Sequence, residues 1–146
     1  MSKILFSLLF LLMIAWTGSA QADLVLIANP AIAENTISRE EAINIYMGRL
    51  RRFPSGASAQ PLDLPANGTE KALFYRLLVN KELSDIDAYW ARLVFSGRAS
   101  PPHTVGSLQE MLERVAGETN VIGYVDRAFV DKRVRVIMEL PSTGAR

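Results

Sequence analysis

Four amphipathic segments alternate with short apolar runs along this chain, and that alternation is the feature that most restricts its fold. Each segment opens with a polar cap residue followed three positions later by an acidic residue, the spacing of a capping box. Apolar residues then recur at helical spacing, so each predicted helix has one face to bury. The helix starts are predicted at Ser38–Glu41, Asn67–Glu70, Ser84–Asp87 and Ser107–Glu110.

Four further segments predict β-strands. Two are apolar throughout or nearly so and indicate buried strands, and one is short. In the fourth, two sets of residues alternate along the chain, which is typical of a half-exposed strand near a sheet edge. In chain order they cover residues 24–28, 61–64, 121–125 and 133–140. Because helices and strands are interleaved, the predicted class is α/β, with a small mixed sheet flanked by about four helices.

The first residues have the layout of a signal peptide. Lys3 precedes an apolar run from Ile4 to Trp16, and Ala20-Gln21-Ala22 matches an A-x-A cleavage site. We therefore predict a signal peptide over residues 1–22 and one domain over residues 23–146. The prediction implies a periplasmic protein without membrane insertion after cleavage. An uncleaved N-terminal anchor is the alternative.

Charge and cysteine content exclude several classes of function. The chain has 16 Lys and Arg and 15 Asp and Glu residues, and removal of Lys3 with the leader leaves a formally neutral domain. This balance does not favour nucleic acid or an anionic membrane surface as a partner. Cysteine is absent, which excludes thiolate catalysis and thiolate metal sites. A domain of about 124 residues can be stabilised by its core alone.

The sequence does not indicate an enzyme. His103 is the only histidine, it lies in a Pro-Pro-His segment interpreted as an exposed loop, and no Gly-x-Ser-x-Gly motif is present. The carboxylates lack the spacing of a metal site. We therefore predict no catalytic residue, no metal and no cofactor.

Two groups of side chains allow more than one interpretation. Arg49, Arg51 and Arg52 follow the first predicted helix, where they either complement the helix dipole and solvate the surface or recognise an anion. Arg98, beside Gly97, is either a loop residue or a second cation that reaches a cleft. A stripe of aromatic residues is interpreted as core rather than as a ligand platform. The stripe comprises Phe74, Tyr75, Tyr89, Trp90 and Phe95.

The loop from Leu64 to Glu70 carries the clearest candidate for a ligand site. It connects a predicted strand to a predicted helix, and the start of a helix presents free amides and the positive end of the dipole. Asn67, Gly68 and Thr69 suit an oxyanion there, because glycine admits a close backbone approach and its neighbours offer polar side chains. The competing interpretation is that Asn67 and Glu70 only cap the helix, with the Glu70 carboxylate repelling an anion.

Several short motifs follow one another in a fixed order along the chain. The series is Ile45–Arg49, Pro61–Leu64, Asn67–Thr69, Phe74-Tyr75, Ala88–Trp90, Phe95–Gly97, Pro101-Pro102 and Ile122–Val125. Taken in order, these motifs resemble those of phosphate ABC transporter substrate-binding proteins, in particular the short, single-lobe members. The similarity runs from about Leu24 to Leu140.

This resemblance implies a single periplasmic-binding-protein-like (type II) lobe. It also implies a solute-binding protein without catalytic activity that takes up phosphate or another small oxyanion at a helix start, through Asn67, Gly68 and Thr69. Arg49 and Arg98 are the candidate cations. In two-lobed relatives the phosphate lies between the lobes, and only Gly68 and Thr69 match that binding motif here, with Asn67 in place of serine. The alternative is a protein-interaction module of the cell envelope, with an envelope protein or a second copy of the chain as its partner.

Overall fold

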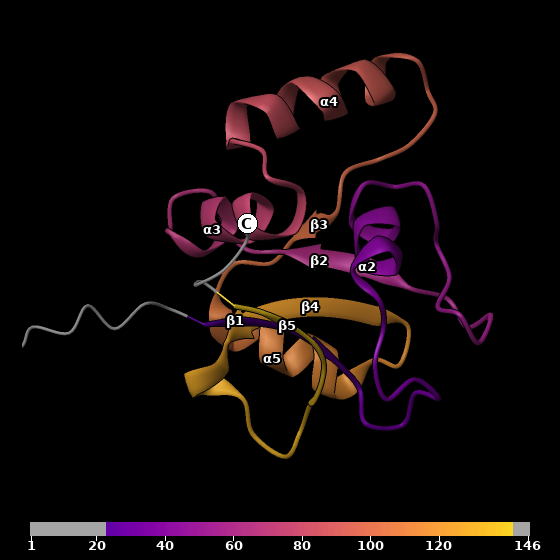
Figure 1. Ribbon diagram of the computed structural model, residues 1–146, viewed down its shortest axis with the longest axis vertical. Helices are drawn as coiled ribbons and strands as arrows, with labels where there is room; N and C mark the ends of the chain where they lie inside the picture. Colours follow the sequence, from indigo (N-terminus) through magenta and orange to yellow (C-terminus); the bar gives the residue numbers. More distant parts are fainter. Residues whose placement is uncertain (1–22, 142–146) are drawn as a thin grey trace, which may run out of the picture.

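The computed structural model describes residues 23–141. The predicted signal peptide, residues 1–22, lies outside the described residues. Within residues 23–141, four helices and five strands follow one another, as predicted for an α/β chain (Figure 1). The helices are α2 (Arg39–Tyr46), α3 (Glu70–Val79), α4 (Leu83–Phe95) and α5 (Leu108–Gly117). The strands are β1 (Leu24–Ala28), β2 (Gln60–Asp63), β3 (His103–Thr104), β4 (Val121–Asp126) and β5 (Arg135–Leu140), with a 3₁₀ turn at Arg127–Phe129.

The strands form one mixed sheet in the order β3-β2-β4-β1-β5. Strand β2 runs parallel to both β3 and β4, whereas β1 is antiparallel to β4 and β5. All five residues of β1 are buried, and β5 lies at an edge, so the predicted buried strand and the predicted edge strand are confirmed. The short strand β3 was not predicted: its two exposed residues carry no apolar pattern, and pairing with β2 alone creates it.

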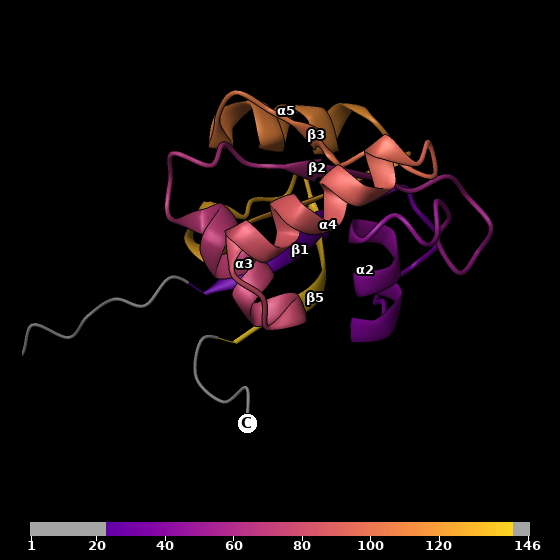
Figure 2. The same ribbon diagram turned by 90° about the horizontal axis from the view of Figure 1, so that it is seen from above.

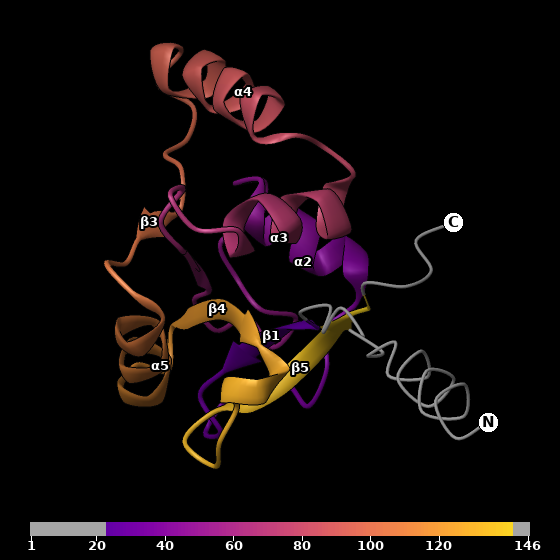
Figure 3. The ribbon, with the colours of Figure 1, turned by 90° about the vertical axis from the view of Figure 1, so that its left-hand side faces the viewer.

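Helices cover both faces of the sheet. Figure 3 shows α5 on one face and α2 and α3 on the other. Successive β4 residues lie against helices on opposite faces of the sheet. Gly123 approaches Met111 of α5, while the Tyr124 ring stacks on Phe74 of α3 with ring centroids 3.8 Å apart. Helix α4 is the outermost helix, above α2 and α3, and Figure 2 shows it crossing the molecule from the side of α3.

The predicted helix caps were right for two helices and wrong for two. Ser38 and Glu41 form the expected capping box, and Ser107 accepts a hydrogen bond from Glu110 N. The predicted Asn67–Glu70 capping box is wrong, since Thr69 is the N-cap of α3 and gives no side-chain hydrogen bond. The predicted start of α4 at Ser84 is also wrong. Its N-cap is Glu82, because α3 ends in a left-handed residue at Asn80 and the chain re-enters a helix almost at once.

Candidate functional site

The predicted oxyanion loop lies at the surface, where the carboxyl end of β2 leads into α3. Asn67, Gly68 and Thr69 are all exposed. Thr69 caps α3 without a side-chain hydrogen bond, so the first-turn amides of α3 lack the serine partner that the starts of α2 and α5 have. Uncapped amides at a helix start favour an anion.

The Glu70 carboxylate lies over Gly68. A Cβ built on Gly68 would be only 2.6 Å from Glu70 Oε2, so the glycine is what leaves room for the folded-back acid. A carboxylate in this place repels a second anion, by about 4 kcal/mol for unit charges ~4 Å apart near a protein surface and less in salt. The loop therefore combines free helix-start amides with an acid that opposes their use.

One of the two candidate cations lies away from this loop. Arg49 lines a cavity of about 600 Å³ that also includes residues 78–81, at the C-terminal end of α3. Because α3 has 10 residues, that end is about 15 Å from the helix start. Arg98 is exposed beyond the end of α4. The fold therefore does not bring Arg49 together with residues 67–69.

A buried carboxylate lies directly beneath the loop. Asp63, the last residue of β2, is only 3% exposed. It accepts hydrogen bonds from the hydroxyl groups of Tyr75, at 2.8 Å, and Tyr124, and Lys71 Nζ lies 3.6 Å from Asp63 Oδ2. The Tyr124 oxygen in turn accepts a hydrogen bond of 3.1 Å from Leu64 N. This network ties β2, β4 and α3 together and fixes where the loop begins.

Burial dominates the ionisation of this cluster. It raises the pKa of Asp63 above its usual range, against the hydrogen bond from Tyr124, the charge of Lys71 and the hydrogen bond from Tyr75, which all favour the carboxylate. Burial next to Asp63 also raises the pKa values of Tyr75 and Tyr124 far above their ordinary value. Both phenols therefore remain protonated and act as donors to Asp63.

A cavity of about 380 Å³ opens beside this cluster, at the carboxyl ends of β2 and β3. This is the end of an open α/β sheet at which ligands usually bind. Asp63, Lys71, Asp87 and Thr104 supply polar groups to its lining. With two carboxylates and one ammonium, the lining does not favour an anion inside the cavity.

Helix α4 is held against the end of α2 by two aromatic residues. Tyr89 Oη donates a hydrogen bond of 2.6 Å to Met47 O. Gly48 has a positive φ of 73°, and a Cβ there would be 2.8 Å from Cη2 of Trp90. Met47 and Gly48 at the end of α2 are therefore in contact with Tyr89 and Trp90 of α4. Glycine is required at position 48 because its φ is positive and because the Trp90 ring leaves no room for a side chain.

Most of the aromatic stripe is core, as expected. Phe74, Tyr75 and Trp90 are buried and Tyr89 is half-buried. The expectation was wrong for Phe95, which is 96% exposed at the end of α4. It lies beyond the part of α4 that reaches the rest of the molecule, so helical spacing alone could not reveal its exposure.

The described residues lack both a cluster that could hold a metal ion and a helix that could span a membrane. Within residues 23–141, no group of three or more His, Cys, Asp or Glu side chains is arranged to hold a metal ion. Among the helices of the same residues, none is both long and apolar enough for a membrane span.

Comparisons with known proteins identify the fold. No family model matches the sequence, and no curated protein matches it. An ABC-type phosphate transport receptor from Vibrio cholerae superposes with a TM-score of 0.63 at 18% identity, over 80% of this chain and 45% of the receptor. PstS from Borrelia burgdorferi gives a TM-score of 0.60 at 17% identity, over 80% of this chain and 47% of that protein.

The chain therefore has a periplasmic-binding-protein-like α/β fold, and it spans less than half the length of these solved proteins. The structural neighbours are binding proteins.

Proposed function

We propose that this chain is an exported, non-catalytic solute-binding lobe that takes up phosphate or a similar small oxyanion at the start of α3. The observation that carries the proposal is the uncapped first turn of α3, next to Asn67, Gly68 and Thr69. The similarity of the fold to phosphate transport receptors supports it. Arg49 is not part of the proposed site, because it lies near the C-terminal end of α3, whereas Arg98 stays a candidate cation.

Glu70 controls affinity in this proposal. An incoming oxyanion must displace the carboxylate from above Gly68. Calorimetry of residues 23–146 with phosphate is expected to show binding that Glu70→Gln strengthens about tenfold, because repulsion between like charges is removed. Thr69→Ala is expected to weaken binding by about three- to tenfold through loss of one hydroxyl.

Glu40→Gln is the matched control, since Glu40 is an exposed acid in the first turn of α2. It should leave the phosphate affinity unchanged. Absence of heat with millimolar phosphate in both the unmodified protein and Glu70→Gln would refute the proposal. Equal affinities in all variants would move the site away from α3.

A second candidate function is a protein-interaction module, and the end of α4 favours it. Phe95 is 96% exposed and Val94 is 54% exposed, so two successive residues at the end of α4 present large apolar side chains to solvent. We expect a second copy of the chain to cover them. Burial of one phenylalanine contributes about 2 kcal/mol, so Phe95→Ser is expected to weaken self-association about thirtyfold in sedimentation velocity measurements.

The control for this experiment is Phe129→Ser, because Phe129 is also exposed, at 53%, but belongs to the 3₁₀ turn after β4. It should leave self-association unchanged. A protein that stays monomeric up to its solubility limit would count against the interaction module and leave the phosphate proposal unaffected.

A further inference from the structure

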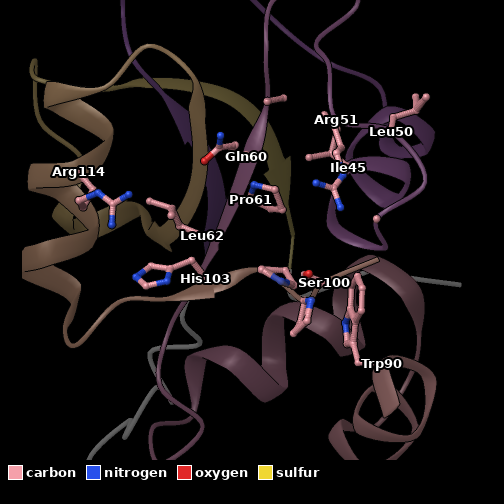
Figure 4. Close-up of a pocket in the computed structure, with 14 residues that line it drawn as sticks. Ile45, Leu50, Arg51, Gln60, Pro61, Leu62, Trp90, Ser100, His103 and Arg114 are labelled. Atoms are coloured by element: carbon pink, nitrogen blue, oxygen red, sulfur yellow. The ribbon is translucent and has the colours of Figure 1, made fainter. Parts of the chain in front are cut away.

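A third cavity lies between the end of α2, the strands β2 and β3, and α4 (Figure 4). Its volume is about 510 Å³, which is within the range of small-molecule sites. Its polar lining is supplied by Gln60, Ser100, His103 and two arginines, Arg51 and Arg114. Among the described residues that line it there is no Asp or Glu. The cavity therefore has a positive lining that the sequence did not predict.

The two arginines are not equivalent. Arg114 is paired with Glu118 on the same helix, so much of its charge is already balanced. Arg51 has no carboxylate partner among residues 23–141. Figure 4 shows Arg51 and Trp90 on one side of Pro61, with His103 and Arg114 on the other. The unbalanced positive charge therefore belongs to the end of the cavity that contains Trp90.

Trp90 gives an independent indication of a ligand. The residue is 7% exposed, and its indole Nε1 is buried without a hydrogen-bond partner. A buried donor without an acceptor costs free energy, and such groups are uncommon in folded proteins. An acceptor that enters from the cavity that Trp90 lines would satisfy this donor.

The rest of the lining is apolar and flat. Pro61, Leu62, Pro101 and Pro102 lie around the same space as the Trp90 ring. An inorganic ion would leave these surfaces without contacts, whereas a ring would cover them. Proline and tryptophan faces pack well against planar groups.

We propose that this cavity binds a small organic anion, a carboxylate attached to a flat apolar body. The carboxylate pairs with Arg51 and accepts from Trp90 Nε1, and the apolar body lies against the prolines. The inference goes beyond the oxyanion site at α3, because the residues that carry it do not overlap with residues 67–70.

The indole N–H of Trp90 can be used to follow ligand binding at this site. Trp16 and Trp90 are the two tryptophans of the chain, so residues 23–146, which contain the whole described fold, have a single indole N–H. We would follow the Trp90 indole cross-peak in ¹⁵N-edited NMR spectra at constant ionic strength during titrations with benzoate, benzyl alcohol and inorganic phosphate. Benzoate carries both charge and ring, and the other two probes each carry one of these features.

Benzoate is expected to shift the indole resonance in a saturable way, with a Kd on the order of 1 mM for so small a ligand. Benzyl alcohol and phosphate are each expected to bind at least about tenfold more weakly. Arg51→Gln should weaken benzoate binding about tenfold, because one charge-assisted pair is lost. Arg51 is exposed, so its replacement spares the core.

Arg133→Gln is the matched control, since Arg133 is exposed, pairs with Asp131 and does not line the cavity. It should bind benzoate as the unmodified protein does. No indole shift at saturating benzoate, or an equal response to benzyl alcohol or to phosphate, would overturn the proposal. An unchanged affinity in Arg51→Gln would also overturn it. Thr69→Ala should leave benzoate binding intact, which separates this site from that proposed at α3.

Discussion

Replacement of Asp63 with alanine is expected to lower the free energy of unfolding by about 3 kcal/mol. The change removes the acceptor of two buried phenols, Tyr75 and Tyr124, and each hydroxyl left without a partner costs about 1–3 kcal/mol. It also leaves Lys71 without its carboxylate. Urea denaturation of residues 23–146 at neutral pH measures the difference.

Asp131→Ala is the control, because Asp131 is an exposed acid whose partner, Arg133, is exposed as well. It should change stability little. Asp63→Asn keeps one acceptor oxygen and should fall between Asp63→Ala and the unmodified protein. If Asp63→Ala were as stable as Asp131→Ala, the two phenols would have found other acceptors and the network would not hold β2 to β4.

The same carboxylate gives a pH dependence with a defined sign. The pKa of Asp63 is raised in the folded protein, so the folded state keeps its proton to a higher pH than the unfolded chain does. The part of its stabilisation that is linked to this proton is complete below the ordinary carboxyl pKa and is lost as the pH rises through the raised value, whereas the hydrogen bonds from the two tyrosines remain above it. Asp63→Asn should lack this slope when denaturation is repeated across that range.

Local signals predicted local structure well in this chain. The Ser38 and Ser107 caps form as expected, because a serine and an acid three residues later interact whatever surrounds them. The start of α4 was misplaced, because the left-handed turn at Asn80 and the packing of Leu83 and Ile86 set it earlier. Strand β3 was missed, because its pairing with β2 depends on residues about 40 positions away.

Candidate sites were harder to predict for the same reason. The α3 loop is a continuous segment, so its residues could be selected from the sequence. Arg51, Trp90 and His103 come from three separate segments, and only the fold brings them around one cavity. Asp63 did leave a signal: an acid between Leu62 and Leu64 in a predicted strand must find buried partners. Its partners, two tyrosines on β4 and α3, could not be identified without the fold.

Replacement of Gly123 with valine is expected to lower the free energy of unfolding by about 3 kcal/mol or more. A Cβ at this position of β4 would be 2.4 Å from Met111 Sδ and 3.1 Å from Val115 Cγ2, so α5 must move away from the sheet. Overpacking of a core costs about 1–3 kcal/mol, and the rigid second branch of valine adds to it. Gly123→Ala should lose about 1–2 kcal/mol, because the gain in strand propensity opposes the clash.

The cause of this loss can be isolated with a second substitution, since the nearest atom belongs to the flexible side chain of Met111. Met111→Ala alone should destabilise the protein by about 2–4 kcal/mol through loss of buried volume. The double variant with Gly123→Val should be less destabilised than the sum of the two single changes, because the valine fills the space that the methionine leaves. Gly117→Ala is the control: a Cβ there meets nothing within 4 Å, so stability should be unchanged or slightly higher. Additive losses in the cycle would mean that Gly123 is needed for its backbone rather than for the contact between α5 and the sheet.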